Sequence, residues 1–387
     1  MSEIVTEDPV LRDTVIRINL SAIAQNMKNI CTLVGPDVAV AAVIKANGYG
    51  HGALALAPVL MESGASLLAV ATLGEALELK KAYPDYPVLI MGLTPDTYLP
   101  YVVKYHIIQT IDTVHQARLL NRIGEENGCP VHIHLKIDTG FHRIGFPDDE
   151  KTLQSILELR DMPRLITDGI FSHLALFDEA SDREQYDRFL NAVSFLESHG
   201  FQFRYRHIAD SIALVDDPQY RLNMVRAGAL IYGLKGFHKG FVSVQQALTF
   251  ETRISHISTV PAGEGVSYDY TCRAEKETRV ATLPFGYADG YPRNLRGKGF
   301  VTIRGIRCPI IGVICMDQCM ADLTNVPDAE IGDTAIIYGD GSENTADIQE
   351  ISELAQTNKN EIVSRLSLRP PRIYETDTTP SIIRSEK

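Results

Sequence analysis

Short runs of apolar and β-branched residues alternate with helical patterns between about residues 38 and 234. The eight runs are VAVAAVI (38–44), LLAVAT (67–72), VLIMG (88–92), IIQTI (107–111), VHIHLKI (131–137), DGIFSH (168–173), YRHIA (205–209) and ALIYG (229–233). Segments between them, such as GEALELKKAY (74–83) and EQYDRFLNAVSFLESHG (184–200), are predicted helices, and the second ends on a glycine suited to a C-cap. Eight strands with intervening helices predict a TIM-type (β/α)8 barrel, which we place at residues 12–245. An open doubly wound sheet is the alternative, although no GxGxxG motif follows the first strand.

Beyond Phe250 the pattern changes to β-branched runs separated by Gly, Pro, Asn and Asp at hairpin-like intervals. The runs are RISHISTV (253–260), RVATLPFG (279–286), GFVTIRG (299–305), CPIIGVICM (308–316) and TAIIYG (334–339). They predict a second, mostly β domain, completed by a helix at 348–356 and a final strand at 370–376. We place this domain at residues 246–387 and assign residues 1–11 to it as well.

Composition and charge narrow the class of partner. The 387 residues are 45% hydrophobic and carry a net charge of −12 without any basic tract, which argues against nucleic acid and anionic membranes as partners. The acidic N-terminus, MSEIVTEDPVLRD, lacks the basic and apolar regions of a signal peptide. No apolar run approaches the ~20 residues that a membrane helix needs. We therefore expect a cytoplasmic protein that has no membrane partner.

The six cysteines do not indicate a metal site. They lie at positions 31, 129, 272, 308, 315 and 319, form no CxxC pair and lack zinc-like spacing. Reduced thiols in a cytoplasm explain them best, and we expect no bound metal.

The stretch VIKANGYGHG (43–52) holds the strongest candidate for chemistry. Lys45 ends an apolar run that has the composition of a buried strand, and glycines follow at 48, 50 and 52. In a barrel, the segment after a strand is the usual place of catalytic residues. A partly desolvated lysine there can be neutral near pH 7 and can form a Schiff base. A surface lysine just past a core strand is the alternative explanation.

Other polar residues also cluster at predicted strand ends. Lys136, Asp138 and Arg143 surround the fifth strand, and His173 ends the sixth. Asp210 and Ser211 follow the seventh, whereas Arg226 precedes the eighth apolar run. Each residue alone has a structural explanation, such as a satisfied histidine or an N-cap serine. Together they predict a catalytic face at one end of the barrel.

At this point the sequence resembles the alanine racemase family nearly from end to end. The motifs that carry the resemblance are AVIKANGYGHG (42–52), LKIDTGFHRIGF (135–146), SHLALFD (172–178), MVRAGALIYGL (224–234), GVSYDYTCRAE (265–275), PFGYADGYPR (284–293), GVICMDQCMADLT (312–324) and the terminal LRPPRIY. The resemblance implies a pyridoxal 5'-phosphate enzyme, acting as a homodimer on a small amino acid. A role in D-alanine supply for peptidoglycan is the family expectation.

The resemblance also implies a role for individual residues. Lys45 matches the Schiff-base lysine, which moves a proton on one face of the substrate, and Tyr268 of the second subunit matches the base on the other face. Arg226 matches the arginine that faces the pyridine nitrogen of the cofactor. His173 and Arg226 also match the family residues whose positive charge lowers the pKa of the tyrosine base. The phosphate would be held by Tyr49, Ser211 and the backbone near Gly228 and Ala229. Arg143 matches the arginine that binds the substrate carboxylate, and Lys136 matches a lysine that many relatives carry as a carbamate. Met316 and Asp317 match a pair that reaches into the partner's site. The residues that match the substrate entrance are Asp178, Tyr287 and Arg293.

Several positions depart from the family pattern. Leu368 stands where a tyrosine usually contacts the phosphate and narrows the pocket, and Asp210 replaces the usual Asn. Phe141 and His142 replace Met-Gly, and Ala227 replaces Pro. A pocket rejects an added hydroxyl only weakly, by about a hundredfold. We therefore hypothesise serine racemisation beside that of alanine, or a broader amino-acid specificity.

Two further alternatives share the fold. A decarboxylase is disfavoured by Arg226, because such enzymes place an acid at that position. A non-catalytic pyridoxal-phosphate carrier is disfavoured by the full β domain with Tyr268, which a carrier does not need.

Overall fold

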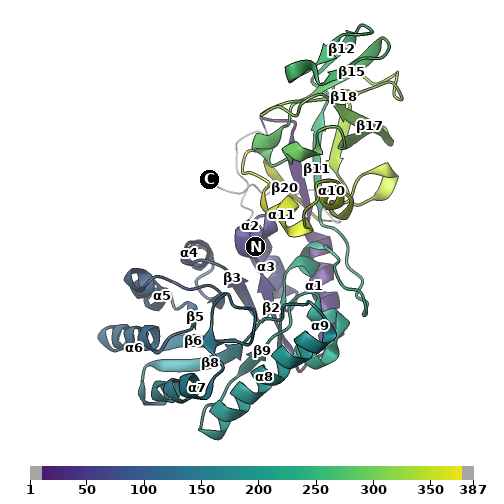
Figure 1. The fold of residues 1–387 in the computed structure, drawn as a ribbon. Helices are drawn as coiled ribbons and strands as arrows, with labels where there is room; N and C mark the ends of the chain where they lie inside the picture. The colour runs from purple at the N-terminus through teal and green to yellow at the C-terminus, as the bar shows by residue number, and fades with distance from the viewer. Residues whose placement is uncertain (1–10, 377–387) are drawn as a thin grey trace.

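The structure, a computed structural model, describes residues 11–376, which form a barrel and a separate β domain (Figure 1). The barrel is a near-closed ring of parallel strands in the order β10-β2-β3-β4-β5-β6-β8-β9. These strands are β2 Ala39–Val43, β3 Leu67–Val70, β4 Val88–Ile90, β5 Ile108–Ile111, β6 Val131–Asp138, β8 Leu165–Phe171, β9 Tyr205–His207 and β10 Met224–Ala227. The ring closes where the Arg226 amide donates to the Ala209 carbonyl just beyond β9, at an N···O distance of 3.1 Å. The predicted barrel is thereby confirmed.

Helices surround the barrel (Figure 1). They are α1 Leu20–Val34, α3 Ala53–Glu62, α4 Leu73–Ala82, α5 Leu99–Lys104, α6 Val114–Asn127, α7 Glu150–Ile156, α8 Glu179–Ser198 and α9 Ala213–Asp216. Because helices cover the outer face, a strand such as β2 (AVAAV) is buried along nearly its whole length. Helix starts follow side-chain capping, since Thr113 caps α6 and Asp178 caps α8 through backbone N–H groups of the first turn.

The eighth strand was predicted at the wrong place. The apolar run at 229–233 forms a short 3-10 helix, η4 Ala229–Tyr232, whereas β10 lies directly before it. Residues 224–227 pair in parallel with β2, and Val225 lies opposite Val40. Gly233 adopts a φ of +79° next to the Gln245 backbone, which ends the run as a turn. Arg226 therefore lies on a barrel strand and does not precede one.

The β domain is built on a nine-stranded sheet in the order β12-β15-β18-β17-β16-β19-β11-β1-β20. Its strands are β1 Val15–Asn19, β11 Leu248–Arg253, β12 His256–Val260, β15 Thr278–Leu283, β16 Phe300–Ile303, β17 Ile306–Ile311, β18 Cys319–Asp322, β19 Thr334–Tyr338 and β20 Arg372–Glu375. A hairpin of β13 Gly265–Val266 and β14 Cys272–Arg273, with helices α10 Ile348–Leu354 and α11 Lys359–Ser364, completes the domain. All five predicted β runs and the terminal strand overlap these strands, but β1, β13, β14 and β18 were not predicted, and only the last residue of β11 falls within a predicted run.

The first described strand belongs to this second sheet. β1 lies between β11 and β20, antiparallel to the former and parallel to the latter. Residues 15–19 fall within the segment that the sequence pattern assigned to the barrel. Residues 1–10, which were assigned to the β domain, lie outside the described residues, and the domain limits stay a prediction.

The two domains meet beside the segment that follows β2. In Figure 1, α11 of the β domain lies next to α2 Lys45–Tyr49 of the barrel. A Cβ atom placed on Gly50 would lie 2.2 Å from the Val363 carbonyl oxygen, so the two backbones are in direct contact. The buried Arg372 of β20 also donates from Nε to the Gly50 carbonyl at 3.1 Å. The β domain therefore packs directly on the turn that carries Lys45.

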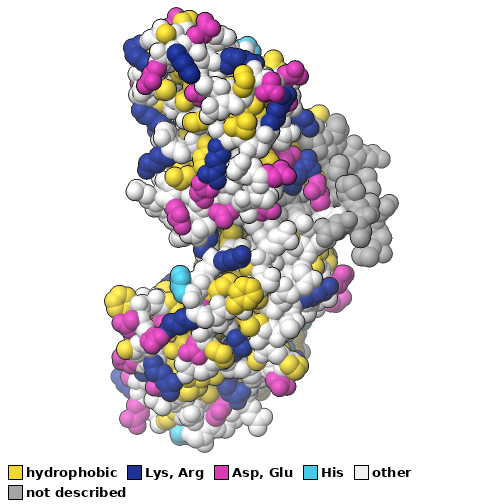
Figure 2. Space-filling model, turned by 90° about the vertical axis from the view of Figure 1, so that its right-hand side faces the viewer, with side chains coloured by type: hydrophobic (Ala, Val, Ile, Leu, Met, Phe, Trp, Pro, Cys, Tyr) yellow, Lys and Arg dark blue, Asp and Glu magenta, His cyan; other side chains and the backbone are white. Residues whose placement is uncertain are grey.

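The surface between the lobes is hollowed on the face shown in Figure 2, where acidic and basic side chains are interspersed over both lobes. Among residues 11–376, none of the helices combines the length and apolar character that crossing a membrane requires.

Candidate active site

Lys45 follows β2 at the carboxyl end of the barrel, where the chain enters a left-handed turn. The φ angles of Ala46, Asn47, Gly48 and Tyr49 lie between +52° and +60°. The left-handed conformation costs an L-residue other than glycine roughly 1–2 kcal/mol. Three of these four residues are not glycine, so contacts from elsewhere in the fold must hold the turn.

Glu75, at the start of α4, provides the main support of this turn. Its Oε1 accepts a hydrogen bond from the Ala46 amide at 2.7 Å. Its Oε2 accepts from the amides of Ala71 at 2.9 Å and Thr72 at 3.0 Å, the latter as part of a capping box. Within the turn, Asn47 Oδ1 accepts from the Ala53 amide at 2.9 Å. The Lys45 segment is thereby tied to two neighbouring barrel helices.

A cavity of about 480 Å³ opens at this end of the barrel. Nine of the residues singled out from the sequence line it, namely Lys45, Tyr49, Lys136, Arg143, His173, Ser211, Arg226, Gly228 and Ala229. Asp210, one of the departures from the family pattern, lines it as well. These residues lie on five different barrel strands or follow them, and the fold brings them together as the sequence predicted.

One part of the cavity is suited to a phosphate group. Ser211 Oγ accepts a hydrogen bond from the Gly228 amide at 2.8 Å. A Cβ atom on Gly228 would lie 2.8 Å from Tyr49 Oη, so only glycine lets this hydroxyl approach the backbone so closely. Ala229 begins η4, and the first N–H group of a helix has no acceptor within the helix. Two hydroxyls and backbone N–H groups together form a donor set that fits the phosphate of pyridoxal 5'-phosphate.

Basic side chains dominate the remainder of the cavity wall. Burial, followed by the neighbouring Arg143, lowers the pKa of Lys45 below its ordinary value. Burial, followed by Arg226, lowers the pKa of Lys136 to about 7. The Lys136 ammonium or amine donates to the Ile137 carbonyl at 2.6 Å. Burial therefore favours the uncharged amine of both lysines, and a pKa of about 7 gives Lys136 a sizeable neutral fraction near neutral pH.

Arg226 is buried and anchors a chain of buried imidazoles. Its guanidinium donates to His207 Nδ1 at 2.9 Å and to His173 Nδ1 at 3.0 Å, and also to two backbone carbonyls. Because an arginine only donates, His207 must accept at Nδ1, carry its proton on Nε2 and donate to His134 Nδ1 at 2.9 Å. Burial, followed by Arg226, lowers the pKa of His173 to about 2. Burial also lowers the pKa of His134 to about 4 and that of His207 well below its ordinary value, so all three rings are neutral. The positive charge expected at His173 was therefore a wrong prediction, and of this pair Arg226 carries the charge.

Sequence reasoning missed His134, His207 and Glu75. A signal for the first was present, because His132, His134 and Lys136 occupy alternate positions of VHIHLKI and alternate residues of a strand share one face. The polar interior of the barrel could have been inferred from that pattern. His207 and Glu75 are single residues that no local pattern distinguishes.

The residues predicted to act across a subunit interface lie outside this cavity. Tyr268 is 67% exposed at the tip of the β13–β14 hairpin, and Met316 is 53% exposed. Asp317 pairs with Arg369 at 2.8 Å, and Leu368 is 75% exposed. The predicted entrance residues are also elsewhere: Tyr287 and Arg293 line a separate β-domain cavity, and Asp178 caps α8.

Comparison with known proteins is consistent across both domains. Family models described as "Alanine racemase, N-terminal domain" and "Alanine racemase, C-terminal domain" match residues 18–236 and 247–374. The alanine racemase of Clostridium tetani is 38% identical over 377 residues, which are 95% of this chain and 96% of that protein. That of Desulforamulus reducens is 39% identical over 363 residues, 92% of this chain and 97% of that protein.

Solved structures of alanine racemases superpose on this chain over nearly its whole length. The alanine racemase of Clostridium difficile 630 superposes with a TM-score of 0.91 at 31% identity over 98% of both chains. The alanine racemase of Bacillus anthracis with bound L-Ala-P superposes with a TM-score of 0.89 at 30% identity, again over 98% of both chains.

Proposed function

Because the chain belongs to the alanine racemase family, we propose that it interconverts L- and D-alanine with pyridoxal 5'-phosphate in the barrel cavity. One observation carries the proposal. Lys45, Arg143 and Arg226 line a single cavity in a chain that its relatives match nearly from end to end. The cavity volume of about 480 Å³ lies in the range of small-molecule sites, roughly 300–1,000 Å³.

The residues at the cavity wall divide the task of holding the cofactor. Lys45 would hold it covalently through its amine, and Tyr49, Ser211 and the N–H groups of Gly228 and Ala229 would hold its phosphate. When bound, the cofactor supplies the electron withdrawal that makes the Cα–H bond of an amino acid acidic. The protein contributes position and proton transfer.

Lys45 serves as the base on one face of the substrate, since it lines the cavity and its burial favours the uncharged amine, the form that accepts the Cα proton. Racemisation needs a second acid or base on the opposite face, and we assign it to Tyr268 of the partner subunit. In support, Tyr268 is exposed and does not line the cavity of its own chain. The working unit is therefore a homodimer with a two-fold interface. Met316 and Asp317 would accompany Tyr268 into the partner's site.

Arg226 argues for racemisation and against decarboxylation. Burial lowers the pKa of Arg226 to about 10, so it stays protonated at neutral pH and would only donate a hydrogen bond to the ring nitrogen of the cofactor, which must then be unprotonated to accept it. An unprotonated ring nitrogen withdraws electrons less strongly, which limits side reactions of the carbanion. The neutral imidazoles of His173 and His207 hold the guanidinium in place.

Arg143 would bind the substrate carboxylate. Its guanidinium lies over the Phe141 ring, 4.4 Å from the ring centroid, and that ring contacts His173 at 5.0 Å between centroids. Lys136 can react with carbon dioxide to give a carbamate, because a pKa of about 7 leaves a sizeable neutral fraction at physiological pH. Such a carbamate would place an anion near Arg143 and orient it.

Serine is the second substrate that we propose. Asp210 lines the cavity, and Leu368 is exposed and does not narrow the cavity of its own chain. The substrate entrance would be formed by Asp178, Tyr287 and Arg293 once two subunits associate. Cytoplasmic location and a role in D-alanine supply remain predictions.

Turnover of L-alanine and L-serine by the purified protein, with the D-products separated chirally, tests this function. Wild-type protein should be yellow and form D-alanine, whereas Lys45→Ala should lose both the colour and the activity. An alanine preference beyond about a thousandfold in kcat/KM would exclude a serine racemase. Yellow protein that forms neither product would favour the carrier.

A further inference from the structure

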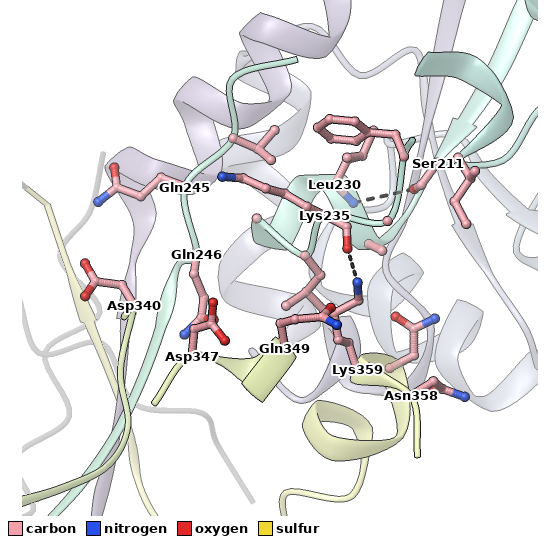
Figure 3. A pocket seen from close by; sticks show the side chains of 18 of the residues that line it. Ser211, Leu230, Lys235, Gln245, Gln246, Asp340, Asp347, Gln349, Asn358 and Lys359 are labelled. Atoms are coloured by element: carbon pink, nitrogen blue, oxygen red, sulfur yellow. Dashed lines mark hydrogen bonds between the residues drawn. The ribbon is translucent and has the colours of Figure 1, made fainter. Parts of the chain in front are cut away.

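A second cavity, of about 790 Å³, adjoins the first between the barrel and the β domain (Figure 3). Figure 3 shows Ser211 and Leu230 of the barrel at one side of it and Asn358 and Lys359 of α11 at another. The two cavities share four lining residues, namely Ser211, Ile212, Ala229 and Asn360. Since Ser211 and Ala229 belong to the phosphate donors described above, the cavities meet at the phosphate end of the cofactor site.

Asn360 occupies an unusual place in this arrangement. All other described residues that line the cofactor cavity lie between positions 43 and 229, in the barrel, whereas Asn360 comes from α11 of the β domain. Its position is fixed, because Asn358 caps α11 by accepting from the Glu361 amide at 2.9 Å and α11 packs on the Gly50 backbone. Lys359 additionally donates to the Lys235 carbonyl, which ties the helix to the barrel (Figure 3).

The Asn360 side chain is free to bind a ligand. Asn360 is an exposed residue, and its amide has no hydrogen-bond partner among residues 11–376. A primary amide provides two N–H donors, and the oxygens of a phosphate group act mainly as hydrogen-bond acceptors. The other phosphate donors are neutral hydroxyls and backbone N–H groups, and Asp210 places a carboxylate in the same cavity. An additional donor would therefore strengthen phosphate binding noticeably.

We propose that Asn360 donates an amide hydrogen bond to the phosphate of bound pyridoxal 5'-phosphate. The β domain of the same chain thereby closes the phosphate end of the site, in addition to the part it plays in the partner's site. The proposal rests on the proposed function only insofar as the cofactor is pyridoxal 5'-phosphate.

Titration of the cofactor-free protein tests this assignment. Pyridoxal 5'-phosphate and pyridoxal, which lacks the phosphate, are added separately, and Kd is read from the absorbance of the lysine-bound cofactor. Asn360→Ala should raise Kd for pyridoxal 5'-phosphate about tenfold, because one hydrogen bond to a charged group is lost. Asn360→Asp should raise it on the order of a hundredfold, because a carboxylate would repel the phosphate. Neither variant should change Kd for pyridoxal.

Gln349→Ala is the matched control, since Gln349 is another amide of the outer cavity that does not line the cofactor cavity. It should leave both Kd values unchanged. The assignment is overturned if Asn360→Ala binds pyridoxal 5'-phosphate like wild type, or if it weakens both ligands equally, which would indicate a structural effect. Unfolding curves of the variants verify that each is folded.

Racemisation at saturating cofactor is measured separately. Wild-type protein that binds pyridoxal 5'-phosphate through Asn360 without forming any D-amino acid would refute the proposed function and leave this inference standing. Wild-type protein that fails to bind the cofactor would refute both.

Discussion

Replacing Glu75 by alanine is expected to loosen the left-handed turn that carries Lys45. The substitution removes the acceptor of three backbone amides, those of Ala46, Ala71 and Thr72. It leaves helix propensity at least as favourable, because alanine is the best helix former. The effect should therefore arise from the lost hydrogen bonds, which include the capping box of α4, and not from a lower helix propensity.

The magnitude follows from where these bonds lie. A hydrogen bond to a charged group contributes about 1.5–3 kcal/mol when it is buried, and about 1 kcal/mol or less where water can replace the acceptor. Two of the three bonds, those to Ala46 and Thr72, are at exposed positions. One bond of about 1.5–3 kcal/mol and two of up to about 1 kcal/mol each give a loss of about 2–5 kcal/mol in the free energy of unfolding, out of the roughly 5–15 kcal/mol typical of a folded protein. Because the turn positions Lys45, turnover should fall about ten- to a hundredfold.

The assay compares Glu75→Ala with Glu78→Ala, a substitution of an exposed glutamate on the same helix whose side chain makes no hydrogen bond within the described chain. Urea unfolding gives the change in free energy, and racemisation at saturating cofactor gives the change in turnover. Glu78→Ala should behave like wild type in both measurements. If the two variants lose equal stability and equal activity, Glu75 does not support the turn and the reasoning fails.

Three other outcomes are expected. Tyr268→Phe should lower turnover roughly a hundred- to ten-thousandfold and still bind cofactor, as measured by racemisation and absorbance, and full activity would exclude a two-base mechanism. Gly50→Ala should destabilise the protein by about 3 kcal/mol or more, because a Cβ would meet the carbonyl of α11 at 2.2 Å. Gly128→Ala is the control, because Gly128 has a similar φ but a Cβ there would meet no other atom, and it should cost only about 1–2 kcal/mol. If urea unfolding gives the same loss of free energy for both variants, the contact between the domains at Gly50 is refuted. Finally, the hydrogen bond to Asp168 raises the pKa of His132, so this pair should stabilise the fold below pH 6.5 and lose that contribution as the pH rises through the raised value. Asp168→Asn should flatten the dependence of unfolding free energy on pH between 6 and 8, and an unchanged slope would show that the pair does not titrate as described.

Periodicity predicted the architecture well, because most of the signal is local. Apolar runs such as AVAAV at 39–43 form buried parallel strands, and helices surround them in the expected order. The exception is the eighth strand. MVRA at 224–227 contains an arginine, which is rarely buried, whereas ALIY at 229–232 has no charged residue and includes the strand formers Ile231 and Tyr232, so local preference favoured the wrong segment. Pairing with β2 decided the outcome.

The lining of the cavity could be predicted from polar residues at strand ends, since those ends meet at one face of the barrel. Its supporting contacts could not. Glu75 supports a turn whose left-handed conformation is disfavoured for Ala46 and Tyr49. Because residue propensities do not predict such a turn, they cannot predict the residue that supports it. The position of β1 depends on its pairing with β20, from the other end of the described chain. The position of Asn360 beside the barrel cavity likewise depends on contacts between segments that lie far apart in the sequence.

The left-handed turn also bears on the order in which the enzyme assembles. Local preference opposes the conformation of Ala46–Tyr49, so contacts with Glu75 of the barrel and with the β domain are needed to set Lys45 in place. Two of the contacts that oppose relaxation of this turn, the backbone of α11 against Gly50 and the guanidinium of Arg372, come from residues that are synthesised more than 300 positions after the turn. We therefore expect a nascent chain to capture its cofactor only after residues 359–372 have been synthesised and docked. The yellow colour of the bound cofactor would then appear only when folding is complete, and a chain truncated before residue 359 would not bind pyridoxal 5'-phosphate.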